Sequence, residues 1–121
     1  MRTGERLPRN RPEALLPEAI VEMSRKGMGM TCIVDSDDRL LGIYTDGDLR
    51  RTLERHETIR KLPVGEVMTR NPATIAADRL AAEAARLLET RDLGGKLVVT
   101  TPEGRLAGAL TFHDLLAAGV V

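Results

Sequence analysis

The chain has 121 residues, of which 18 are basic, 18 acidic, two histidine and one cysteine, so its formal net charge is zero. This length suffices for one compact domain or two small lobes without a supporting disulfide or metal, and the single cysteine excludes an internal disulfide. The balanced charge and the scarcity of aromatic residues give no reason to expect a nucleic-acid or membrane-surface partner.

The N-terminal segment MRTGERLPRNRPE contains no apolar stretch of the kind found in secretory signals. No run in the sequence approaches the roughly 18 apolar residues that a membrane span requires. We therefore expect a cytoplasmic protein that does not contact a membrane.

The first half of the chain predicts two helices and two strands. In chain order, the expected elements are a helix at 16–26, a strand at 31–35, a turn at 36–38, a strand at 39–45 and a helix at 47–56. Serine and aspartate in the turn are typical of a hairpin connection. Residues 61–72, KLPVGEVMTRNP, hold two prolines and are the expected link to the second half.

The second half predicts the same order of elements. Residues 79–92 are rich in strong helix formers with apolar side chains at helical spacing, and KLVVT is typical of a buried strand. The expected elements are an extended lead-in at 72–75, a helix at 79–92, strands at 96–100 and 105–111 joined by the turn TPEG, and a closing helix at 111–118.

Two similar stretches indicate an internal duplication. DRLLGIYTDGDL at 38–49 aligns without gaps with GRLAGALTFHDL at 104–115, and both keep glycine, threonine and aspartate at the same spacing. Upstream, TCIVD matches KLVVT, and the initial MRTGERLP occupies the place of MTRNPATI. We therefore predict two repeats, residues 1–60 with a truncated lead-in and residues 61–121.

The order β-α-β-β-α in two copies, each with G-h-h-T-x-x-D (h is apolar) closing its last strand, resembles a tandem pair of cystathionine-β-synthase (CBS) domains. This resemblance covers nearly the whole chain. It implies an α/β fold in which two lobes face each other across a pseudo-two-fold axis (a Bateman module). It also implies a regulatory module that binds nucleotides and commonly forms a homodimer.

The stretches MSRKGMGMTCIVD, TDGDLRR, VGEVMTRNP and HDLLAAGV further resemble the CBS pair at the C-terminus of bacterial arabinose-5-phosphate isomerases. In those enzymes a separate sugar-isomerase domain carries the chemistry and makes a precursor of Kdo, the acidic sugar of lipopolysaccharide. We therefore expect this chain to be an excised module or a stand-alone sensor, and not itself an enzyme. No nucleophile–base pair is found in the sequence, so no catalytic residue is predicted.

Thr45 and Asp48, and likewise Thr111 and Asp114, have the spacing of a helix capping box. The alternative is a ligand site, because free N–H groups at a helix N-terminus suit a phosphate and a carboxylate accepts hydrogen bonds from a ribose diol. The two interpretations are compatible, since Asp48 is expected to keep acceptor positions to spare. The family resemblance favours all four residues as ligand contacts.

Four further residues belong to the predicted ligand site. At least one of Arg50 and Arg51 is expected on a solvated helix face, while the other is placed to clamp a phosphate. Lys96 is either solvated or faces an acidic group of the ligand. Thr74, in the lead-in of the second repeat, completes the set.

The expected ligand is a nucleotide or nucleotide sugar. CMP-Kdo is a candidate feedback ligand through the isomerase resemblance, and AMP and ATP are the candidates that the wider family implies. A module that only dimerises and binds no ligand is the alternative.

Asp46 and Asp48 form a D-x-D pair, but without further carboxylates nearby we predict no metal site and no resident cofactor. Cys32 is expected in the core and His113 on the surface.

Overall fold

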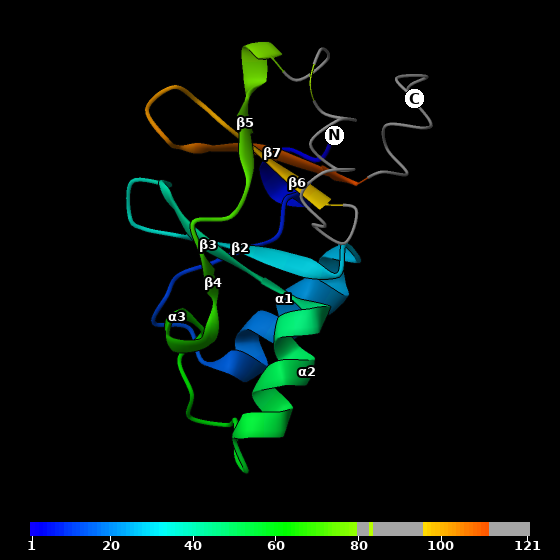
Figure 1. Cartoon of the computed structure of the whole chain (residues 1–121), viewed down its shortest axis with the longest axis vertical. Coiled ribbons are helices and arrows are strands. Elements are labelled where there is room, and N and C mark those ends of the chain that lie inside the picture. The colour runs from blue at the N-terminus through cyan, green and yellow to red at the C-terminus, as the bar shows by residue number, and fades with distance from the viewer. Residues whose placement is uncertain (80–82, 84–95, 112–121) are drawn as a thin grey trace. The chain divides into compact units, whose positions relative to one another are not determined.

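The computed structural model of the chain describes residues 1–79, 83 and 96–111 and divides into two compact units (Figure 1). One unit comprises Leu7–Pro72 and is called the α1–α2 unit; the other comprises Met1–Arg6 and Ala73–Val121 and is called the β5–β7 unit. Each unit contains its own β-sheet. The combination of sheets and helices confirms the predicted α/β class.

The sheet of the α1–α2 unit has four strands in the order β1-β2-β3-β4. They are β1 (Arg9–Asn10), β2 (Met30–Val34), β3 (Leu40–Thr45) and β4 (Thr69–Arg70). β1 runs parallel to β2, and β3 runs antiparallel to both β2 and β4. Every residue of β2 is buried, as expected for a short apolar strand with a neighbour on each side.

Three helices complete this unit. They are α1 (Leu16–Lys26), α2 (Asp46–Arg55) and α3 (Val64–Val67). The prediction for α1 is confirmed with the same bounds, and α2 begins and ends one residue earlier than predicted. The link between the repeats is more ordered than a plain connection, because it contains both α3 and β4.

The core of the α1–α2 unit lies between one face of the sheet and the helices (Figure 1). Its buried members are Leu16, Ala19 and Met23 of α1, Ile33 of β2, Tyr44 of β3 and Val64 of α3. Leu49 of α2 packs against this cluster and is partly buried. Burial of this apolar face holds α2 in place, and the candidate site described below is built at its N-terminal end.

Gly27 ends α1 in the left-handed conformation, with φ of 65°, and its N–H donates to the Met23 carbonyl. A Cβ at this position would meet no atom within 4 Å, so any effect of substitution comes from the backbone alone. We expect Gly27→Ala to lower the free energy of unfolding by about 1 kcal/mol, because left-handed backbone is unfavourable for alanine. Chemical denaturation measures this loss. Gly27→Asn should recover part of it, and an equal loss in both variants would contradict the explanation.

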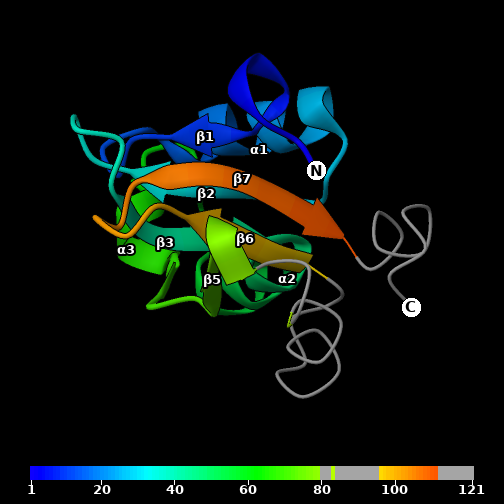
Figure 2. The same cartoon turned by 90° about the horizontal axis from the view of Figure 1, so that it is seen from above.

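The described part of the β5–β7 unit is a three-stranded sheet in which β6 lies between β5 and β7 (Figure 2). The strands are β5 (Thr74–Ala76), β6 (Lys96–Thr100) and β7 (Leu106–Thr111), and short 3-10 turns occupy Gly4–Arg6 (η1) and Ala77–Arg79 (η2). β5 is parallel and β7 antiparallel to β6. The helices expected at 79–92 and 111–118 lie outside the described residues, apart from Arg79, Glu83 and Thr111.

The strand register corrects one part of the repeat alignment. Met30 pairs with Thr45 in one sheet, and Lys96 pairs with Thr111 in the other. Lys96 is therefore the counterpart of Met30, whereas the match of TCIVD with KLVVT had placed it against Thr31. A slip of one residue exchanges the two faces of a strand, and both strands are apolar enough to hide it from pattern matching.

The lead-ins of the repeats make corresponding contacts in the two units. Thr69 lies opposite Ile43 in β3, and Arg2 lies opposite Ala109 in β7. The chain then passes into the other unit, where β1 pairs with β2 and β5 pairs with β6. The first residues of the chain, Met1–Arg6, therefore belong to the same compact unit as Ala73–Val121, and Leu7–Pro72 form the other unit. The predicted boundary between the repeats, after residue 60, describes the duplication in the sequence and remains a prediction.

Candidate ligand-binding site

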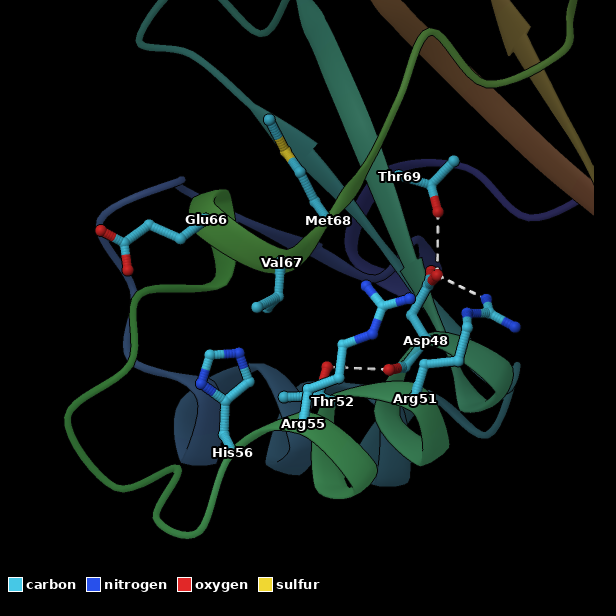
Figure 3. A pocket seen from close by; sticks show the side chains of 9 residues that line it. All are labelled: Asp48, Arg51, Thr52, Arg55, His56, Glu66, Val67, Met68 and Thr69. Atoms are coloured by element: carbon cyan, nitrogen blue, oxygen red, sulfur yellow. Dashed lines mark hydrogen bonds and ion pairs between the residues drawn. The ribbon is translucent and has the colours of Figure 1, made fainter.

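A cavity of about 390 Å³ opens beside α2 in the α1–α2 unit (Figure 3). Its lining comes from α2 and its C-terminal cap on one side, and from α3 and β4 on the other. The residues are Asp48, Arg51, Thr52, Arg55, His56, Glu66, Val67, Met68 and Thr69. Two of the predicted ligand contacts, Asp48 and Arg51, are therefore brought together at one cavity.

The N-terminus of α2 is closed by the predicted capping box. Thr45 is the N-cap residue, and its hydroxyl oxygen accepts a hydrogen bond from the Asp48 N–H at 3.2 Å. In return, the Asp48 carboxylate accepts from the Thr45 N–H at 2.9 Å. These reciprocal bonds satisfy two backbone donors that a helix start leaves without partners, and they fix the Asp48 side chain.

The Asp48 carboxylate has less spare capacity than the sequence suggested. Oδ2 accepts from the N–H and the hydroxyl of Thr45, while Oδ1 accepts from Arg51 Nη2 at 2.7 Å and Thr69 Oγ1 at 2.8 Å. A carboxylate offers about four acceptor positions, and here four donors occupy them. The expectation of positions to spare is wrong because Thr69 and Arg51 both reach this buried group.

A second chain of hydrogen bonds supports the site from the core. The Thr52 hydroxyl donates to the Asp48 carbonyl at 2.8 Å and lies 2.8 Å from the Tyr44 hydroxyl. Tyr44 is fully buried, and its burial raises the pKa of the phenol above the ordinary value. The phenol therefore stays neutral near pH 7 and anchors the first turns of α2 to β3.

The wall of the cavity on α2 is positively charged. Arg51 and Arg55 are four residues apart and therefore lie on the same face of the helix, and His56 caps its C-terminal end. Figure 3 shows both arginines beside Asp48 and Thr52, with Glu66 on the opposite segment. Asp48 neutralises Arg51, and Arg55 has no ion pair with any residue that the structure describes, so the α2 wall offers a cation to an anionic group, with the acidic Glu66 on the opposite side.

The other predicted contacts lie elsewhere. Arg50 is exposed and does not line the cavity, as expected for one of the two neighbouring arginines. Thr74 is exposed at the start of β5, while the half-buried Lys96 and Thr111 are cross-strand neighbours in the β5–β7 unit. Asp114 falls outside the described residues. The ligand-binding roles of all these residues remain predictions.

Thr69 and Arg55 were missed by sequence reasoning. Thr69 is 21 residues from Asp48 and reaches it only because β4 pairs with β3, so no local pattern indicates the contact. Arg55 does carry a signal, since its spacing of four residues from Arg51 places the two on one helix face.

Within the described ranges, no group of three or more histidine, cysteine, aspartate and glutamate side chains is placed to hold a metal ion. Cys32 is fully buried in β2 as predicted, and burial raises the pKa of its thiol to about 12. None of the helices that the structure describes is long and apolar enough to span a membrane.

Each sheet has a short strand parallel to one strand of an antiparallel hairpin, and this arrangement, together with the duplicated threonine–aspartate motif of the sequence, defines a tandem regulatory module of the CBS type. The family model of the CBS domain matches residues 11–55 and 64–120, and the chain belongs to this family. It is 46% identical over all 121 residues to arabinose 5-phosphate isomerase KdsD of Pseudomonas aeruginosa, but spans only 37% of that protein. The corresponding protein of Escherichia coli K12 is 39% identical, with 36% of its length covered.

Solved structures show the same fold. The crystal structure of CBSX2 in complex with AMP matches 99% of this chain and 92% of its own, with a TM-score of 0.83 and 26% sequence identity. This likeness spans both repeats and confirms the predicted CBS-pair architecture.

Proposed function

We propose that this chain is the regulatory nucleotide-binding module of an arabinose-5-phosphate isomerase. The observation that carries the proposal is the buried, pre-oriented Asp48 carboxylate at a cavity that also holds Arg51, Arg55 and Thr69. Its whole-length similarity to KdsD proteins supports the link to the isomerase. The sugar-isomerase domain of such a parent protein is the partner on which the module acts, and this chain contributes no catalytic group.

In this proposal the cavity binds a ribose phosphate. Asp48 accepts hydrogen bonds from the diol, and Arg51 and Arg55 neutralise the phosphate. Thr111 and Asp114 supply the corresponding contacts of the second repeat, with Thr74 and Lys96 as further contacts. A bound nucleotide changes the isomerase activity only if it has different affinities for two states of the parent enzyme, because equal affinities shift no equilibrium.

CMP-Kdo is the proposed ligand. It carries a phosphate and a sugar carboxylate, and two anionic groups suit a cavity with the cations Arg51 and Arg55 in its wall better than a neutral sugar does. The pathway implied by the similarity to KdsD makes this compound a feedback signal for the isomerase. Cytoplasmic location follows from the same proposal.

An adenine nucleotide is the second candidate, favoured by the similarity to CBSX2, whose crystal structure contains AMP.

Exposed apolar side chains on the two helices α1 and α2 favour a homodimer as the assembly. Val21 of α1 and Leu53 of α2 are 55% and 57% exposed, and dimerisation would bury such residues. A module that only dimerises is the alternative in which no nucleotide binds.

Thermal melting with CMP-Kdo, CMP, AMP, ATP and a buffer blank tests the proposal. A ligand present at about a hundredfold excess over its Kd stabilises the folded state by about 2.7 kcal/mol, which raises Tm by several degrees. We expect a shift with CMP-Kdo that exceeds the shift with AMP. A Tm shift with adenine nucleotides alone would support nucleotide binding but contradict the role of CMP-Kdo as a feedback ligand. No Tm shift with any ligand would contradict nucleotide binding and favour a module that only dimerises.

A further inference from the structure

The four donors on the Asp48 carboxylate mean that a ligand hydroxyl gains access to it only by displacing one of them. The two donors from Thr45 belong to the helix cap, and breaking them would open the first turn of α2. Thr69 is held by the pairing of β4 with β3, and its β-branched side chain has few rotamers. The two Thr45 donors are therefore costly to remove, whereas Thr69 is exposed and its hydroxyl is held in place by the pairing of a two-residue strand.

Arg51 is the donor that an anionic ligand attracts most strongly, because it is the charged one among these four donors. Its side chain is 54% exposed, and an ion pair with so much solvent access contributes little to stability. The long side chain has many rotamers, so it moves without disturbing the helix. Its guanidinium lies beside Gly47, where an added Cβ would be 3.4 Å from Arg51 Nη1, so that neighbour has no side chain to hold Arg51 in place.

A bound anion would give Arg51 a new partner in place of the ion pair that it loses with Asp48. Arg55 lies one helical turn further along the same cavity wall, and a phosphate near both guanidinium groups would accept hydrogen bonds from each. Arg51 would then exchange one anionic partner for another, while Asp48 Oδ1 becomes available to a ligand hydroxyl. A ligand that lacks a phosphate offers no such exchange and has to compete with Arg51 for the carboxylate.

We propose that Arg51 determines the specificity of this site by making the Asp48 contact conditional on a phosphate. The affinity of the site for a nucleotide then exceeds its affinity for the corresponding nucleoside by more than the contacts of the phosphate alone would give. This inference rests on the proposed function, since it assumes that a nucleotide binds at Asp48. Arg51 is both the gate to Asp48 and a phosphate ligand.

The test compares nucleotide and nucleoside affinities of the wild-type chain, Arg51→Met and Arg25→Met. Isothermal titration with CMP against cytidine, and with AMP against adenosine, gives the Kd values. Methionine keeps a long apolar stem but donates no hydrogen bond. Arg25 is the matched control, because it is exposed in the last turn of α1, does not line the cavity and is not a predicted ligand contact.

In Arg51→Met we expect the nucleotide Kd to rise roughly tenfold through loss of a charge-assisted hydrogen bond. The nucleoside Kd should fall roughly two- to fivefold, because the competing ion pair is gone. Arg25→Met should change neither. Equal weakening of both ligands, or no change in either, would overturn the role of Arg51 while leaving the proposed function intact. If the wild-type chain binds neither nucleotide at millimolar concentration, the proposed function and this inference fail together.

Discussion

Replacement of Asp48 by alanine is expected to lower the free energy of unfolding by about 2–3 kcal/mol. The variant loses the reciprocal cap with Thr45 and leaves the donors of Arg51 and Thr69 without their acceptor. Asp48 is only 6% exposed, so water does not readily replace the carboxylate at the Thr45 donors, whereas the exposed side chains of Arg51 and Thr69 regain hydrogen bonds from water. Chemical denaturation with a fixed m-value measures the loss.

Asp46→Ala is the matched control for this change. Asp46 is an exposed acidic residue in the same first helical turn, and only its favourable interaction with the helix dipole is lost, about 0.5 kcal/mol. Asp48→Asn should fall between the two, because an amide retains one acceptor oxygen but places a donor against other donors. Equal losses for Asp46→Ala and Asp48→Ala would contradict the contacts assigned to Asp48.

Gly42→Ala is expected to lower the free energy of unfolding by about 3 kcal/mol and to weaken nucleotide binding as well. A Cβ at Gly42 would lie 2.5 Å from the Thr69 carbonyl oxygen and 2.8 Å from Met68 Sδ. The backbone of β4 would have to move away from β3. Such a movement would also carry the Thr69 hydroxyl away from Asp48, so one substitution would affect both stability and the site.

Gly108→Ala is the control, since Gly108 occupies the equivalent position in the other repeat. Its Cβ would first meet Met1 Sδ at 2.7 Å, which is part of a flexible side chain, and the Arg2 carbonyl oxygen only at 3.0 Å. We expect a smaller loss of stability and unchanged affinity at the Asp48 site. Denaturation and ligand titration of both variants measure the free energy of unfolding and the affinity. A loss of stability in Gly108→Ala that matches or exceeds that in Gly42→Ala would contradict this account of β4.

Much of the fold was predictable because local patterns determine it. The apolar periodicity and glycine stop of α1 gave its bounds, and the threonine–aspartate spacing gave the capping box at Thr45. The duplication added the hairpins β2–β3 and β6–β7, whereas β1 and β4 were not predicted. The alignment of β6 with β2 as counterparts in the two repeats was not predictable to one residue, because a continuous apolar run fits either alignment.

The site was predictable only where it depends on one helix. Asp48 and Arg51 were predicted from the segment of α2 and the family resemblance, but the ion pair between these two residues was not predicted. The contact from Thr69 depends on how β4 pairs with β3, which no local pattern encodes. The same tertiary contact fills the last acceptor position of Asp48, so the competition for this carboxylate became evident only in the structure.

The most direct test of nucleotide binding at Asp48 is a nuclear magnetic resonance titration of the isotopically labelled chain with CMP-Kdo and, separately, with AMP. We predict that the amide signals of Thr45, Asp48, Arg51 and Thr69 shift together and saturate, while that of the exposed Val21 on α1 stays in place. Saturating shifts confined to other residues, or none with either ligand at millimolar concentration, would contradict a nucleotide site at this carboxylate.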